Sequence, residues 1–143
     1  MDDTSSLGLI LNSLQTGLPV LLPQFLTTVV LLALGMLCYR AITPFNERRL
    51  VAEGNVAGGV AYAGSIVALA IPLAATLATS VVLLDILLWG IVALILQLVG
   101  FGVATLLLRD LRRLIEAGNV AAALALVGIQ IAIALLNAGA MAG

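Results

Sequence analysis

The sequence predicts an all-α integral membrane protein. Four transmembrane helices are expected as two parallel-repeat helical hairpins, with short interfacial helices at the cytoplasmic elbows. The first observation is composition: 63% of the 143 residues are hydrophobic and 9% are charged, whereas soluble domains carry about 25% charged residues. The second is that long apolar runs without charge separate short charged segments. The third is a motif that the chain contains twice.

Four apolar stretches are long enough to cross a hydrocarbon core of about 30 Å, for which about 20 helical residues suffice. Pro23 is expected in the first turn of the first span, where its missing N–H costs nothing. Pro72 lies inside the second span and is expected to kink it. We expect the spans at about 21–39, 56–79, 86–108 and 120–141.

The N-terminal segment, 1–17, is expected on the extracytoplasmic side. Apolar side chains recur with helical spacing over about 5–16. One interpretation is a short helix that lies on the membrane surface. The other is a helical extension of the first span that is broken at Gly17 and Pro19.

The repeated motif consists of Arg-Arg-Leu followed by Gly-Asn-Val-Ala, at an offset of 64 residues. Gly54 and Gly118 are expected to take the left-handed conformation that ends a helix. Asn55 and Asn119 are expected to cap the helix that follows. The motif therefore marks an elbow in each copy. Within one membrane domain, 1–143, we place the first repeat at about 18–79 and the second at about 82–141.

The first elbow has room for a short helix at about 44–53. Thr43 and Pro44 are expected as its N-cap and first residue. Local ion pairs with the elbow arginines are expected for the acidic residues Glu47, Glu53, Asp110 and Glu116.

All six basic residues are arginines of the two elbows: Arg40, Arg48, Arg49, Arg109, Arg112 and Arg113. The positive-inside rule places both elbows in the cytoplasm and both termini outside. The two Arg pairs of the motif, Arg48 with Arg49 and Arg112 with Arg113, are interpreted as topology anchors or as contacts to anionic lipid headgroups.

Four polar residues form a candidate membrane site: Asp85, Gln97, Gln130 and Asn137. The amides can bond between helices or line a polar path. Asp85 can cap the third span or lie inside it as a functional charge. Gln97 belongs to a stripe of small residues on the third span, which could also pack copies of the chain together: Gly90, Ala93, Gly100 and Ala104.

The inventory of reactive side chains is poor. The chain has no His and no Lys, which excludes His-assisted nucleophiles, zinc-protease motifs, Schiff bases and P-loops. Cys38 is the single cysteine and has no base beside it in the sequence. We therefore expect no enzyme activity, no cofactor, no metal site and no nucleic-acid partner.

Several stretches resemble the YjfL-like family of small bacterial inner-membrane proteins, which are built on a domain of unknown function. The order of the motifs carries the resemblance: Thr43-Pro44-Phe45-Asn46-Glu47, Gly54-Asn55-Val56-Ala57, Ile71-Pro72-Leu73-Ala74, Asp85, Trp89, Gln97-Leu98 and Leu136-Asn137-Ala138-Gly139. It covers about residues 25–142 and implies four spans in the bacterial inner membrane. It implies no reaction or substrate.

Three hypotheses for function follow. The first is a non-enzymatic homo-oligomer in the lipid bilayer with a structural or envelope-stress role, with other membrane or envelope-stress proteins as candidate partners. The second is an oligomeric ion or small-solute channel or transporter lined by the four polar residues. The third is a scaffold that binds anionic lipid through its arginine elbows.

Overall fold

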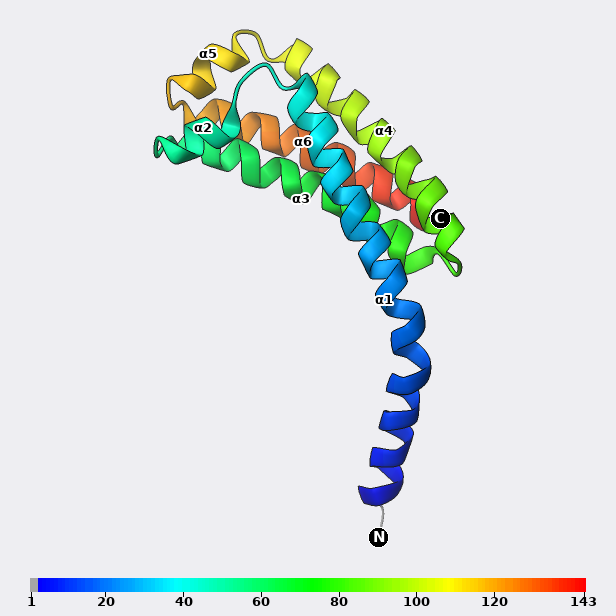
Figure 1. Cartoon of the computed structure of the whole chain (residues 1–143). Helices are drawn as coiled ribbons and strands as arrows, with labels where there is room; N and C mark the ends of the chain where they lie inside the picture. Colours follow the sequence, from blue (N-terminus) through cyan, green and yellow to red (C-terminus); the bar gives the residue numbers. More distant parts are fainter. Residues whose placement is uncertain (1–2) are drawn as a thin grey trace.

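The structure is a computed structural model that describes residues 3–143, with side chains from residue 6 onward. All regular structure in these residues is α-helical (Figure 1). The helices are α1 (Asp3–Ile42), α2 (Glu47–Ala52), α3 (Val56–Thr79), α4 (Leu83–Leu107), α5 (Leu111–Glu116) and α6 (Val120–Ala142).

The four long helices, α1, α3, α4 and α6, are each long and apolar enough to cross a membrane. This confirms the prediction of four apolar spans. Large hydrophobic side chains are exposed on the outer face of every one of them, as at Leu34, Val67, Leu96 and Leu135. Such surface is compatible with a hydrocarbon environment and not with water.

Helix α1 differs from its prediction. It runs without interruption from Asp3 through Gly17, Pro19 and Pro23 to Ile42, so Pro23 is not in a first turn and neither interpretation of the N-terminal segment holds as stated. The two prolines are four residues apart and lie on the same face of α1. Each removes one backbone hydrogen bond, and the loss of such bonds bends a helix. Figure 1 shows α1 bending as it leaves the bundle.

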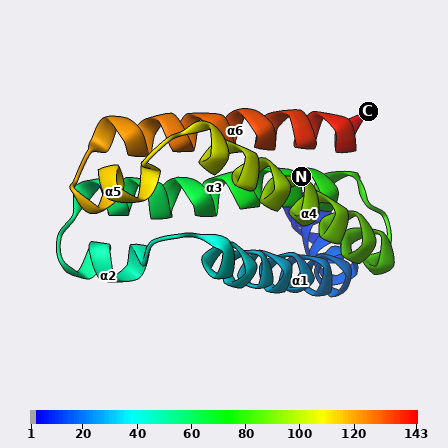
Figure 2. The ribbon, with the colours of Figure 1, turned by 90° about the horizontal axis from the view of Figure 1, so that it is seen from above.

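Helices α3 and α6 pack along each other and run side by side in the same direction from the elbows (Figure 2). Small residues line their contact. Ala57, Ala61 and Ala123 are fully buried, and a Cβ added to Gly64 would collide with the side chain of Val127. Small side chains let helix backbones approach closely, and dispersion contacts then hold the pair together.

The small-residue stripe of α4 is used inside the chain. A Cβ at Gly90 would lie 2.6 Å from Leu31 of α1, and one at Gly100 would lie 2.8 Å from Ile133 of α6. Ala93 is fully buried as well. The expectation that this stripe is free to join copies of the chain was therefore wrong, because the other spans already occupy it.

The first elbow begins differently from its prediction. The Thr43 hydroxyl donates to the carbonyl of Tyr39, so Thr43 closes the end of α1, and Pro44 follows as residues after a helix end commonly do. Helix α2 starts at Glu47, and the side chain of Asn46 is its N-cap, accepting from the Arg49 amide. Leu50 turns inward and is buried.

The Gly-Asn joints have the same geometry in both elbows. Gly54 has φ +75° and Gly118 has φ +81°, a conformation that glycine adopts without strain. The Asn55 side chain accepts from the Gly58 amide, and that of Asn119 accepts from the Ala122 amide. Each joint thus ends a six-residue helix and caps a long one.

One contact ties the elbows to each other. The Asn55 side-chain amide donates to the carbonyls of Ile115 and Glu116, both at 3.1 Å. Both carbonyls belong to the last turn of α5, where helix carbonyls run out of helical N–H partners, and that of Ile115 also accepts from the Gly118 amide at 2.9 Å. Asn55 therefore satisfies two helix ends at once, and it fixes α5 against the start of α3.

Gly64→Val should separate α3 from α6 and lower the midpoint of thermal unfolding in detergent, because overpacking costs about 1–3 kcal/mol. Gly59→Val is the matched control, since a Cβ at Gly59 meets nothing within 4 Å. Equal losses for the two variants would contradict the close approach of these helices.

Candidate functional site

A row of buried polar side chains runs through the inside of the bundle. Its members have at most 6% of their surface exposed and come from all four long helices and α2: Tyr39, Glu47, Ser65, Thr76, Gln97, Gln130 and Asn137. We call this set the buried polar row. It extends from the elbows to the turn between α3 and α4.

At the elbow end, the Tyr39 hydroxyl donates to Oε1 of Glu47 at 2.7 Å. The Tyr39 ring packs on Phe101 of α4 with a centroid separation of 4.5 Å, which fixes the direction of the hydroxyl. Glu47 is 3% exposed, and its Oε2 has no hydrogen-bond partner.

The environment of Glu47 favours its neutral form. Burial raises the pKa of the Glu47 carboxyl to about 7, although the bond from Tyr39 and the charge of Arg40 both act in the opposite direction. Within residues 3–143, no arginine lies at ion-pair distance from Glu47, while Glu53, Asp110 and Glu116 do pair with arginines. The expected local pairing was therefore wrong for Glu47.

In the middle of the row, two amides and one hydroxyl meet. The Ser65 hydroxyl donates to Gln130 Oε1 at 3.3 Å, and Gln97 Nε2 donates to the Gln130 backbone carbonyl at 2.9 Å. Gln97 Oε1 has no partner. A cavity of about 10 Å³ lies between Tyr39, Ser65, Gln97 and Gln130. This is close to the smallest volume that holds one water molecule, and its lining offers polar partners.

At the far end, the Asn137 amide donates to the carbonyl of Ala93 at 2.9 Å, and Asn137 Oδ1 has no partner. Thr76 follows and opens into a cavity of about 260 Å³ that Asp85 also lines, together with Thr79, Ser80, Trp89, Ala140 and Met141.

Asp85 does not cap α4. Val82 occupies the N-cap position and makes no side-chain cap bond. Asp85 is half-buried in the first turn, where a carboxylate interacts favourably with the helix dipole. It stands at the mouth of the far cavity.

The structure thus brings together three of the four polar residues selected from sequence, Gln97, Gln130 and Asn137, and places Asp85 beyond them. Sequence reasoning missed Glu47 and Tyr39 as members of the row. One signal was available: Glu47 lies three residues before Leu50, so the two share a face of any helix formed there. When Leu50 is buried, the Glu47 carboxylate on the same face also points into the protein.

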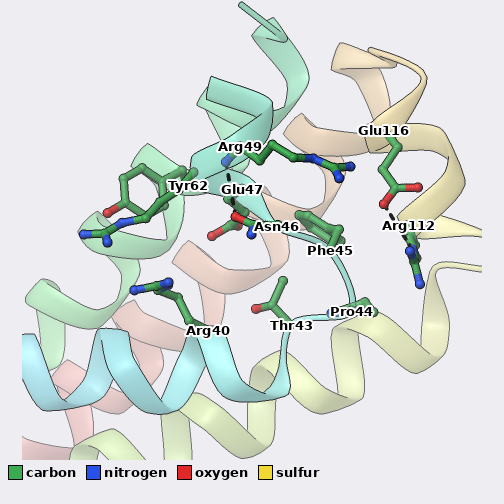
Figure 3. A pocket seen from close by; sticks show the side chains of 11 residues that line it. Arg40, Thr43, Pro44, Phe45, Asn46, Glu47, Arg49, Tyr62, Arg112 and Glu116 are labelled. Carbon is green, nitrogen blue, oxygen red and sulfur yellow. Dashed lines mark hydrogen bonds and ion pairs between the residues drawn. The ribbon is translucent and has the colours of Figure 1, made fainter. Parts of the chain in front are cut away.

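A third cavity, the elbow pocket, has a volume of about 350 Å³ (Figure 3). Three of the four motif arginines line it, and Arg113 does not. The lining residues are Arg40, Thr43, Pro44, Phe45, Asn46, Glu47, Arg48, Arg49, Tyr62, Arg112 and Glu116.

The described residues contain no cluster of three or more His, Cys, Asp or Glu side chains that could hold a metal ion. Cys38 is exposed and forms no disulfide within the described residues.

Residues 13–141 match the family described as Domain of Unknown Function (DUF350). The chain belongs to this family. It is 30% identical over 117 residues to the UPF0719 inner membrane protein YjfL of Escherichia coli K12, an alignment that covers 82% of this chain and 89% of that protein. The YjfL protein of Escherichia coli O157:H7 gives the same values.

The family membership confirms the resemblance seen in the sequence. Together with the four apolar helices, it places the chain among multi-pass inner-membrane proteins. No solved structure matches the chain.

Glu47→Gln should flatten the dependence of stability on pH. Because the folded pKa is raised from 4.5 to about 7, the native protein should lose stability as pH rises from about 4.5 to 7, by on the order of 3 kcal/mol. The variant keeps an acceptor for Tyr39 and has no proton to lose. Thermal unfolding in detergent across this range measures the effect, and a variant as pH-dependent as the parent would contradict it.

Proposed function

We propose that this protein conducts protons across the membrane through the inside of its helix bundle, along the buried polar row. One observation carries the proposal: the row connects cavities at opposite ends of the bundle and contains three acceptor oxygens, on Glu47, Gln97 and Asn137, that have no partner among the described residues. If the row served packing alone, the oxygens of Gln97 and Asn137 would be paired, because a membrane interior supplies no water to satisfy them.

The size of the interior supports protons over larger ions. The space in the middle of the row is about 10 Å³, which has no room for a hydrated cation. Protons can pass along hydroxyl groups, carboxyl groups and single waters. In this proposal Glu47 exchanges its proton with the elbow pocket, and the oxygens of Gln97 and Asn137 orient waters that transiently enter the row.

Two further features of the fold belong to this proposal. The parallel course of α3 and α6, and the shared geometry of the Gly-Asn joints, support a duplicated hairpin. The arginines at both elbows support a cytoplasmic location for α2 and α5, which would lie at the interface, and an outer location for both termini. No catalytic activity is proposed.

A second candidate function is a self-associating scaffold, and the length of α1 favours it. At 40 residues, α1 spans about 60 Å, twice a hydrocarbon core. Its first half extends beyond the bundle and exposes Ile10, Leu11 and Leu14 (Figure 1). Contact with α1 of another copy would cover this surface, in a structural or envelope-stress assembly.

Gln97→Leu and Asn137→Leu should each reduce proton flux by about tenfold or more, because an apolar side chain cannot orient water in the row. Flux is measured in proteoliposomes with an internal pH-sensitive dye and a potassium diffusion potential. Thr105→Val is the matched control, since the Thr105 hydroxyl bonds only to Gly102 of its own helix turn. Parent flux equal to that of protein-free liposomes, or variants equal to the parent, would refute the proposal.

The orientation has its own test. In a Cys38→Ala background, Val81→Cys should react with a membrane-impermeant maleimide in intact cells, while Glu53→Cys should react only after permeabilisation. Both sites are exposed. The opposite pattern of labelling would contradict the proposed orientation and indicate the reverse one.

A further inference from the structure

We propose that the elbow pocket is a binding site for a phosphate group, carried either by an acidic phospholipid headgroup or by a free phosphate. The pocket of about 350 Å³ is lined by four guanidinium groups, which come from α1, α2 and α5: Arg40, Arg48, Arg49 and Arg112. Figure 3 shows Arg40 and Tyr62 on one side of the pocket, and Arg49 and Arg112 on the other.

Two of the four arginines that line this pocket have no ion-pair partner among the described residues. Arg40 and Arg48 have no carboxylate within ion-pair distance among the described residues, while Arg49 pairs with Glu53 at 3.5 Å and Arg112 with Glu116 at 3.1 Å. Exposed pairs of this kind are weak and can exchange for a stronger ligand. Guanidinium groups bind phosphate with charge-assisted, often bidentate, hydrogen bonds.

The lining also contains a buried acid with an unsatisfied oxygen. Glu47 is 3% exposed, and its Oε2 is unpaired. A carboxylate there repels an anion in the pocket, whereas a carboxylic acid does not. Arg40 favours the ionised form of Glu47, and an anion bound to Arg40 offsets that effect. Anion binding and protonation of Glu47 should therefore favour each other, as linkage requires.

The position of the pocket fits a lipid source. Arg40 lies in the last turn of α1, and the pocket lies at the ends of the apolar spans, at the depth of headgroup phosphates in a bilayer. The other titratable or charged groups around Glu47 come from four helices: Tyr39 and Arg40 from α1, Arg48 and Arg49 from α2, Tyr62 from α3, and Arg112 and Glu116 from α5.

The experiment measures binding of short-chain phosphatidylglycerol, short-chain phosphatidylcholine and inorganic phosphate to the full chain in mild detergent, by titration calorimetry. Phosphatidylglycerol should bind the parent, and Arg40→Gln and Arg48→Gln should each weaken it about tenfold. Arg113→Gln removes the same charge outside the pocket, where Arg113 pairs only with Asp110, and should leave affinity unchanged. Thermal unfolding verifies that each variant is folded.

The three ligands distinguish a lipid headgroup from free phosphate and from unspecific attraction. Competition by millimolar inorganic phosphate identifies free phosphate as a source, and binding of the lipid alone identifies the headgroup. Equal losses in Arg113→Gln and Arg40→Gln, or equal affinity for phosphatidylcholine, would overturn the proposal by showing unspecific attraction.

Linkage to Glu47 gives a second measure. Phosphatidylglycerol, whose phosphodiester does not titrate near neutrality, should bind the parent more tightly at pH 6 than at pH 8. Glu47→Gln should remove this difference, and a difference that persists in the variant would refute the coupling. Proton flux plays no part in these measurements, so binding and conduction stand or fall separately.

Discussion

The structure depends on one constraint: in the hydrocarbon core, a polar group finds a hydrogen-bond partner inside the protein or not at all. The chain meets it at the backbone by being entirely helical through its described spans. Its buried side chains meet it only in part. The Thr76 hydroxyl donates to a carbonyl of its own helix, and the Ser65 hydroxyl lies within reach of both the Ala61 carbonyl and Gln130 Oε1. The two glutamines and Asn137 bond between helices. The three oxygens left over mark the place where packing does not fully explain the residues present.

The approach of α3 to α6 sets the geometry of this interior. Because Gly64 brings the two backbones close, Ser65 on the next position reaches Gln130 across the contact. A larger residue at 64 would move the hydroxyl away from the amide. The small residues that provide dispersion contacts therefore also determine which polar groups can meet. The contact between α3 and α6 both stabilises the fold and positions the buried polar row.

The elbows do more than connect consecutive helices, because they also bind each other. Asn55 caps α3 and also binds the last turn of α5, so the two charged segments form one layer at the end of the bundle. That layer carries Glu47 inward against Tyr39 and leaves Arg40 and Arg48 outward around the pocket. In the phosphate-site proposal, the buried acid beside Arg40 and Arg48 would couple the charge of the pocket to the proton on Glu47, so that a ligand at the membrane surface would act on the interior.

The sequence by itself determined the number of apolar spans and the approximate limits of the last three, because charge-free runs of this length have no other stable environment. It also determined the conformations of Gly54 and Asn55, which depend on neighbouring residues alone. Only the tertiary structure decided the uninterrupted course of α1, the use of the α4 stripe within the chain and the burial of Glu47. Each of these depends on which faces meet, and Ala, Val and Leu are too alike along these helices to encode that choice in a local pattern. The partners of Gln97 and Asn137 were undetermined for the same reason: an amide shows in the sequence that it needs a partner, and only packing shows which atom supplies one.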